Sequence, residues 1–429
     1  MNGIFEPIGG RVSVAILALA ASVGFARAEA PAVEAVLTTY ADIAEAGYTD
    51  SLETAKTLDG AIDAFLAGPS ADTLAAAKEA WLAARVPYQQ TEVFRFGNAI
   101  VDDWEGRVNA WPLDEGLIDY VDAGYGTESD ENDLYVANVV ANPMLMIAGE
   151  KVDATEITPE FLSGTLQEAG EIEANVATGY HAIEFLLWGQ DLNGTGPGAG
   201  SRPFTDFDPS NCTNGNCERR GAYLKAASTL LVKDLEEMVA NWNADGAART
   251  VLLDGAPANG LASILTGMGS LSYGELAGER MKLGLLLHDP EEEHDCFSDN
   301  THNSHLYDAL GIQNVYLGSY TRPDGSKVEG PSVSDLVAEK APDVDATLRQ
   351  ELQATLDAMN AMKARAEGGE SYDQMIGEGN TDGNAAVQAA IDGLVTQTRS
   401  IEDAVGVLAL DSIAFEGSDS LDSPDAVFQ

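Results

Sequence analysis

Apolar residues recur at three- and four-residue steps along most of this chain, a spacing typical of amphipathic helices. Alternating patterns typical of strands are nearly missing from the sequence. We therefore predict an all-α fold in which helices pack into bundles. The predicted helices cover residues 32–67, 70–96, 169–188, 219–242, 261–288, 306–320, 336–340, 345–366 and 385–408.

The two halves of the chain are faintly alike in layout. The string TGYHAIEFLLWG in the first half and DALGIQNVYLGSY in the second each close a helix with an aromatic residue, a leucine and a glycine. A glycine-rich stretch at 192–217 lies between them. This pattern indicates an internal duplication, so we predict two similar helical domains at residues 29–200 and 201–429.

The N-terminus has the pattern of a cleavable export signal. Arg11 supplies a weak positive charge, residues 12–25 are apolar apart from two serines, and Ala26-Arg27-Ala28 is a small-x-small cleavage site. We predict a signal peptide at residues 1–28, cleaved after Ala28, and export to the periplasm or cell envelope. An uncleaved membrane anchor is the alternative. No second apolar run of about 18 residues occurs in the sequence, so we predict no membrane span.

The charge of the chain narrows the classes of partner. Its formal net charge is −47, which repels nucleic acid and attracts cations. We therefore exclude nucleic acid as a partner. Solubility in a salty habitat explains the charge equally well, so acidity alone assigns no function.

Three cysteines are few for a chain of 429 residues. Cys212 and Cys217 lie close together in a polar loop, NCTNGNCERR, and an exported protein meets an environment that permits disulfides. We predict a local disulfide between them, which leaves Cys296 single. The C-x-x-C spacing of redox and zinc motifs does not occur.

The string GYHAIEFLLWG holds the most informative candidate residues. His181 and Glu184 are three residues apart on a predicted helix, so both side chains project from one face and are placed to bind a metal ion. The alternative is a packed histidine paired with the glutamate of its own helix. The neighbouring residues are large and apolar, which predicts a buried helix in which a carboxylate needs a partner. This favours a functional pair.

Two further strings carry candidate residues. In ARVPYQQTEVFRFG, Arg85 and Glu92 are seven residues apart, so on a continuous helix they share a face. They can form an ion pair within the fold. Alternatively, Glu92 is a carboxylate ligand and the guanidinium of Arg85 supports it. The string WPLDE places Trp111 and Asp114 in a loop, where functional groups often lie.

A third string, HDPEEEHDCFSDNTHNSH, spans His288 to His305 and holds four of the five histidines together with six carboxylates. Metal binding is one interpretation of this concentration. A solvated acidic loop with incidental histidines is nearly as good an explanation.

At these residues the chain resembles the imelysin-like proteins, and in particular their iron-regulated protein A branch. The G-x-H-x-x-E pattern of the family matches at Gly179, His181 and Glu184. The strings ARVPYQQTEVFRFG, RVNAWPLDE, NCTNGNCERR, EHDCFSDNTH and GIQNVYLG also resemble that branch, so the likeness covers nearly all of the mature chain. It implies two four-helix-bundle domains, a site at their interface and a role linked to iron uptake.

From these observations we predict a metal site, with iron as the expected metal. Oxygen-rich ligation with an imidazole suits iron better than structural zinc. The predicted ligands are His181, Glu184 and the family's glutamate at Glu92, with Arg85 in a supporting role. The weaker candidates are Trp111, Asp114 and His294. Within the histidine-rich string, His305 is the one histidine that we do not carry over from the resemblance.

The expected partner is a metal ion or an iron chelate, passed to an envelope iron-transport partner. Two other functions are kept as alternatives. One is a metallopeptidase, although neither H-E-x-x-H nor H-x-x-E-H occurs at His181, so we predict no peptidase activity. The other is a non-catalytic protein that binds a polysaccharide or another envelope component.

Overall fold

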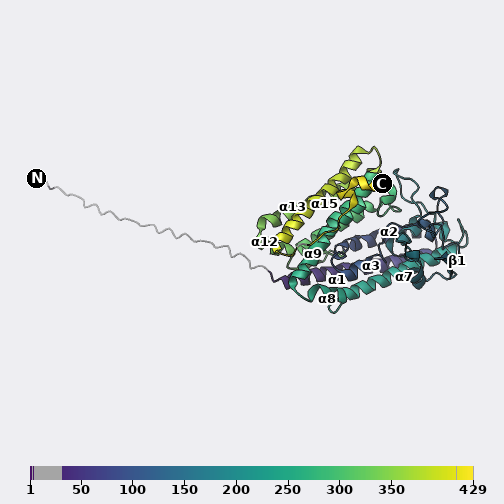
Figure 1. Cartoon of the computed structure of the whole chain (residues 1–429), viewed down its shortest axis with the longest axis horizontal. Helices are drawn as coiled ribbons and strands as arrows, with labels where there is room; N and C mark the ends of the chain where they lie inside the picture. Colours follow the sequence, from purple (N-terminus) through teal and green to yellow (C-terminus); the bar gives the residue numbers. More distant parts are fainter. Residues whose placement is uncertain (2, 4–30, 412, 429) are drawn as a thin grey trace.

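The computed structural model describes residues 1, 3, 31–411 and 413–428. Helices dominate this part of the chain, which confirms a mostly helical fold (Figure 1). The predicted signal peptide, apart from residues 1 and 3, lies outside the described residues. Within the described ranges, no helix is long and apolar enough to cross a membrane.

One group of helices comes from the N-terminal part of the chain. It consists of α1 (Val33–Ala67), α2 (Ala71–Gln89), α6 (Gly179–Trp188) and α7 (Cys217–Trp242). α1 packs against α2 and α7, while α6 packs against the same two helices. Small buried residues such as Ala41, Ala44 and Ala55 bring α1 close to its neighbours. In Figure 1, α1, α2 and α7 run alongside one another in purple, blue and teal.

A second group comes from the C-terminal part. It consists of α9 (Pro257–Ser270), a π-helix η6 (Leu271–Lys282), α10 (Leu283–Leu287), α11 (Thr301–Leu317), α13 (Pro342–Glu367) and α15 (Thr381–Leu408). α13 packs between α11 and α15, and α15 also contacts α9 and η6. The helices α12 (Val333–Lys340), α13 and α15 lie together at the yellow-green end of the molecule in Figure 1.

The two groups meet through close helix contacts. α9 contacts α1, and α11 contacts α2. At the second contact Gly311 approaches the backbone so closely that a Cβ atom on it would lie 2.6 Å from the carbonyl oxygen of Gln90. The candidate site is built beside this junction, from α6 of the first group and the loop before α11 of the second.

Short elements complete the described fold. The α-helical turns are α3 (Ala99–Glu105), α4 (Glu115–Ile118), α5 (Pro159–Phe161), α8 (Ala247–Leu253), α12 (Val333–Lys340), α14 (Tyr372–Ile376) and α16 (Asp419–Asp422). The 3₁₀ and π turns are η1 (Glu92–Phe94), η2 (Ala123–Tyr125), η3 (Leu162–Leu166), η4 (Ala169–Glu171), η5 (Phe204–Phe207), η7 (Pro290–Glu292) and η8 (Pro424–Phe428). Two antiparallel hairpins pair β1 (Met144–Ile147) with β2 (Glu150–Asp153), and β3 (Ser319–Thr321) with β4 (Lys327–Glu329).

Several predicted helix boundaries were wrong. The helix predicted to reach residue 96 ends at Gln89, two residues after Pro87, which has no amide hydrogen for the helical ladder. Its start is as expected, because Ser70 forms a capping box with Thr73. The helix predicted at 169–188 begins only at Gly179, since the residues before it are a 3₁₀ turn followed by extended backbone. The helix predicted from residue 306 begins five residues earlier, at Thr301.

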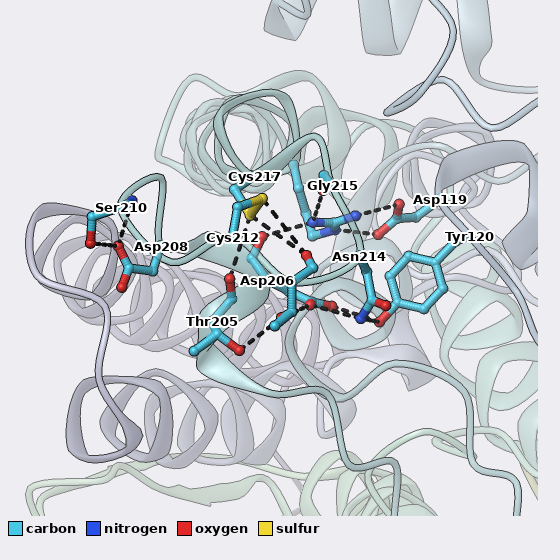
Figure 2. Close-up of a disulfide and its surroundings, with 12 residues drawn as sticks. Asp119, Tyr120, Thr205, Asp206, Asp208, Ser210, Cys212, Asn214, Gly215 and Cys217 are labelled. Atoms are coloured by element: carbon cyan, nitrogen blue, oxygen red, sulfur yellow. Dashed lines mark hydrogen bonds and ion pairs between the residues drawn. A yellow bond between two sulfur atoms is a disulfide. The ribbon is translucent and has the colours of Figure 1, made fainter.

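The predicted disulfide between Cys212 and Cys217 is confirmed, and Cys296 is a free, buried cysteine. Figure 2 shows the loop around the disulfide, with Asp206 at its centre. The carboxylate of Asp206 accepts hydrogen bonds from Thr213 and Asn214 of this loop and from the hydroxyl of Tyr120. The disulfide therefore closes a short loop that is also held by hydrogen bonds to one buried carboxylate.

Candidate metal centre

The start of α6 depends on a glycine. Gly179 has φ +77°, and a Cβ atom built on it would lie 2.4 Å from the carbonyl oxygen of Val108. That same carbonyl accepts a hydrogen bond of 2.8 Å from the amide of Tyr180. The close approach sets where α6 enters the core, and His181 follows two residues later.

Gly179→Ala is expected to lower the free energy of unfolding by about 2–3 kcal/mol, because the left-handed backbone and the contact with Val108 both oppose a side chain. Urea unfolding followed by circular dichroism measures this. Gly149→Ala is the matched control, because Gly149 has φ +81° but open space around its Cβ position. Equal losses in both variants would mean that the contact with Val108 does not matter.

His181 and Glu184 both lie fully inside the protein. Nδ1 of His181 is 3.1 Å from Oε2 of Glu184. The other carboxylate oxygen, Oε1, accepts hydrogen bonds from the amide and the hydroxyl of Ser298, at 3.0 and 2.7 Å. Nε2 of His181 is buried and has no hydrogen-bond partner. An unpartnered buried nitrogen of this kind is costly unless it binds something.

His294 and Asp295 approach His181 from the loop between α10 and α11. One donor atom from each of His181, His294 and Asp295 lies within 4.8 Å of the others. The two imidazole rings meet edge to face, with centroids 4.7 Å apart. The ring of Trp111 covers His181 at a centroid distance of 5.1 Å. We call these three residues, His181, His294 and Asp295, the histidine site.

Asp295 is held by several hydrogen bonds. Arg85, itself buried, donates to Oδ1 at 2.7 Å. Asn300 and Ser304 donate to Oδ2. Burial raises the pKa of the Asp295 carboxyl, but the charge of Arg85, the nearby His181 and the hydrogen bonds from Ser304 and Asn300 together outweigh it, so the pKa is lowered from its usual value. Asp295 is therefore a fixed, ionised carboxylate.

The surroundings of the histidines favour their neutral form. Burial lowers the pKa of His181 well below its usual value, and the charge of Arg85 lowers it further. Burial also lowers the pKa of His294, with Arg280 contributing next. Neutral imidazole is the form that binds metals. Burial raises the pKa of the Glu184 carboxyl, and the charge of Asp295 adds to the rise.

A cleft of about 470 Å³ opens onto the histidine site. His294 and Trp111 form part of its wall, together with Arg95 and Arg280. Six glutamates also line it: Glu105, Glu168, Glu173, Glu275, Glu279 and Glu292. Because the carboxylates outnumber the guanidinium groups, the cleft favours cationic solutes.

Glu92 is not among the three residues whose donor atoms meet at the histidine site. Since α2 ends at Gln89, the expected shared helical face of Arg85 and Glu92 was wrong. Oε2 of Glu92 instead accepts a hydrogen bond of 2.8 Å from Arg280. Arg280 lies in the π-helix η6 and also pairs with Glu275.

Of the weaker candidates, two lie at the histidine site and one lies outside it. Trp111 and His294 lie at the histidine site. Asp114 is hydrogen-bonded to Asn132 and lies outside the group of donor atoms. Asp295 was missed, although it directly follows His294 in the histidine-rich string and a carboxylate beside a candidate ligand was the available signal.

Comparisons with known proteins agree on one family. The family model described as Imelysin matches residues 44–401. Iron-regulated protein A of Synechococcus elongatus is 39% identical over 61 residues, which are 14% of this chain and only 17% of that relative's length.

Solved structures have the same fold. A protein of Parabacteroides distasonis, provisionally assigned as an iron-regulated protein A precursor, is similar with a TM-score of 0.61 and 20% identity. An imelysin-like protein of Psychrobacter arcticum is similar with a TM-score of 0.54 and 18% identity. Each comparison covers 88% of this chain and 96% of the other.

Proposed function

This chain belongs to the imelysin family, and on that premise we propose that it is an exported protein that binds iron and takes part in iron uptake in the periplasm or cell envelope. The observation that carries the proposal is the histidine site, in which His181 brings a donor atom close to those of His294 and Asp295 and its buried Nε2 has no hydrogen-bond partner.

The chemistry of the donors suits iron. Two imidazoles and one carboxylate form the donor set of many non-haem Fe(II) sites, which keep further positions open. In this arrangement His181 binds through Nε2, and His294 and Asp295 supply the other two donors. The bound ion would be cargo or a regulatory ligand, delivered as a free ion or as a chelate.

The neighbouring residues would orient these donors. In the metal-bound form Glu184 accepts a hydrogen bond from Nδ1–H of His181, which leaves the lone pair of Nε2 free for the metal. Glu184 thus supports the ligand His181, whereas the sequence suggested a direct ligand. Arg85 fixes Asp295 in the same way. Glu92 pairs with Arg280 in the wall of the cleft, where it partly neutralises a charge that would repel the ion.

The remaining parts of the proposal concern location and architecture. The predicted signal peptide and the disulfide fit an exported protein. The two groups of helices fit two four-helix bundles that arose by duplication. Because α7 packs with the first group, we place the division between them after Trp242 and not near residue 200. The acidic cleft would concentrate cations at the entrance and hand them to an envelope transport partner.

The peptidase alternative has less support from the site. A zinc peptidase needs a free carboxylate that acts as general base on a metal-bound water. Glu184 is fully buried, and its two oxygens face His181 and Ser298. We therefore expect no cleavage of casein or insulin above the level of a His181→Ala control. Cleavage lost in that variant would favour the peptidase.

Metal analysis of the wild-type protein tests the proposal. The mature protein is loaded with iron and then dialysed against iron-free buffer of high salt concentration, which screens the surface carboxylates. It is expected to retain about one iron per chain. Iron should also raise its thermal stability, since the ion binds the folded form. Loss of all iron on dialysis, without a change in melting temperature, would instead favour the polysaccharide- or envelope-binding alternative.

A further inference from the structure

Three carboxylates meet at a second place in the fold. Glu293 and Asp299 come from the loop before α11, and Asp373 comes from α14. One carboxylate oxygen of each lies within 4.8 Å of the others. Glu293 and Asp373 are each about 1% exposed, and Asp299 is half-buried. We call Glu293, Asp299 and Asp373 the carboxylate site.

Each of these side chains has an unsatisfied atom. Oε1 of Glu293, Oδ1 of Asp299 and Oδ2 of Asp373 are buried and have no hydrogen-bond partner. A buried carboxylate oxygen without a partner is expensive, and three of them beside one another repel as well. The three carboxylates therefore lack a positive charge that would bind their free oxygens and offset their repulsion.

The described protein does not supply that charge at this place. Among the described residues, none of the ion pairs involves Glu293, Asp299 or Asp373, and the charged groups that act on them are carboxylates, either one another or Asp191 and Asp295. The hydroxyl of Ser371 donates to Asp373, but it is neutral. An external cation is the remaining way to satisfy the three oxygens.

We infer that the carboxylate site binds a hard divalent cation, with Ca²⁺ as the best match. An all-oxygen donor set without nitrogen or sulfur suits Ca²⁺ and Mg²⁺ rather than zinc. Ca²⁺ accepts irregular coordination by six to eight oxygens, and the half-buried Asp299 leaves a side open to water. Mg²⁺ demands near-ideal octahedral geometry and is the weaker match.

This inference is independent of the proposed iron binding. The carboxylate site shares no donor residue with the histidine site. Its bound cation would join the loop before α11 to α14, two segments about 75–80 residues apart along the chain. The same loop carries His294 and Asp295, so the cation would fix the segment that presents them.

Calorimetric titration of the mature protein with Ca²⁺, in high salt and after treatment with a chelator, tests the inference. Wild type is expected to bind one Ca²⁺ well above the weak background of its acidic surface. Asp299→Asn and Asp373→Asn should each weaken this binding by more than about 100-fold, since they remove a direct ligand and not an outer-shell partner. Asp403→Asn, an equal charge change at an exposed position of α15, is the matched control.

Thermal unfolding gives a second readout that also shows whether the variants fold. In the presence of chelator, Asp299→Asn should melt at or above the temperature of wild type, because it removes repulsion. With Ca²⁺ added, wild type should become the more stable protein. His294→Ala should keep Ca²⁺ binding even though it disrupts the histidine site. Wild type without a single stronger Ca²⁺ site, or variants that bind Ca²⁺ as well as Asp403→Asn does, would overturn the inference.

Discussion

Replacing His294 by alanine is expected to lower the affinity for Fe(II) by more than about 100-fold while the helical circular dichroism stays unchanged. The substitution removes one of two imidazoles from the histidine site. The remaining donors, His181 and Asp295, leave a site with one nitrogen and one carboxylate, and loss of outer-shell partners alone costs roughly 10–100-fold. Titration with Fe(II) under anaerobic conditions measures the change.

His288→Ala is the matched control, because His288 belongs to the same histidine-rich string but contacts the carbonyl of Ile376 and not the histidine site. It should bind Fe(II) like wild type. If both variants kept full affinity, the iron site would lie elsewhere. If both lost it equally, the loop as a whole and not the imidazole of His294 would be responsible.

Arg85→Met is expected to lower the free energy of unfolding by about 3–5 kcal/mol, measured by urea unfolding in the presence of chelator. Arg85 and Asp295 form a 2.7 Å ion pair in which both side chains are almost completely buried. Methionine fills similar space but leaves the carboxylate of Asp295 without its countercharge. An uncompensated buried charge is the source of the expected loss.

The double variant Arg85→Met, Asp295→Asn separates charge from packing. Removing both charges should recover a large part of the stability lost in Arg85→Met, which gives a coupling energy between the two residues. The single variant would contradict the expectation if it cost less than about 1 kcal/mol, which is the range of an exposed pair. Arg85 also donates to Asn109, so Asn109→Ala measures that separate contact.

Helical periodicity predicted most of the long helices but few of their ends. The pattern at 32–67 agrees with α1 to within a residue, because apolar positions continue through the whole helix and Gly68 ends it. In contrast, the apolar spacing around residues 90–96 belongs to a 3₁₀ turn that is buried for tertiary reasons. Local sequence cannot distinguish a buried turn from a buried helix when the apolar residues of both have the same spacing.

The candidate site was predictable only where its residues are close together in the sequence. The His181–Glu184 spacing is a local property of one helix, so the sequence revealed it directly. The approach of His294 to His181 joins segments more than a hundred residues apart and depends on how the two groups of helices meet. For the same reason the pairing of Arg85 with Asp295 was not visible, and the choice of Glu92 as a ligand stays a prediction.

Glu293 and His294 are consecutive residues, and each belongs to a different site. A cation at either site would therefore restrict the same stretch of backbone. Any change in iron affinity that Ca²⁺ causes must be matched by an equal change in Ca²⁺ affinity that iron causes, because the two binding free energies are linked around one thermodynamic cycle. In a calcium-rich environment this coupling would be heterotropic: the amount of iron bound would depend on the concentration of Ca²⁺ as well as on that of iron.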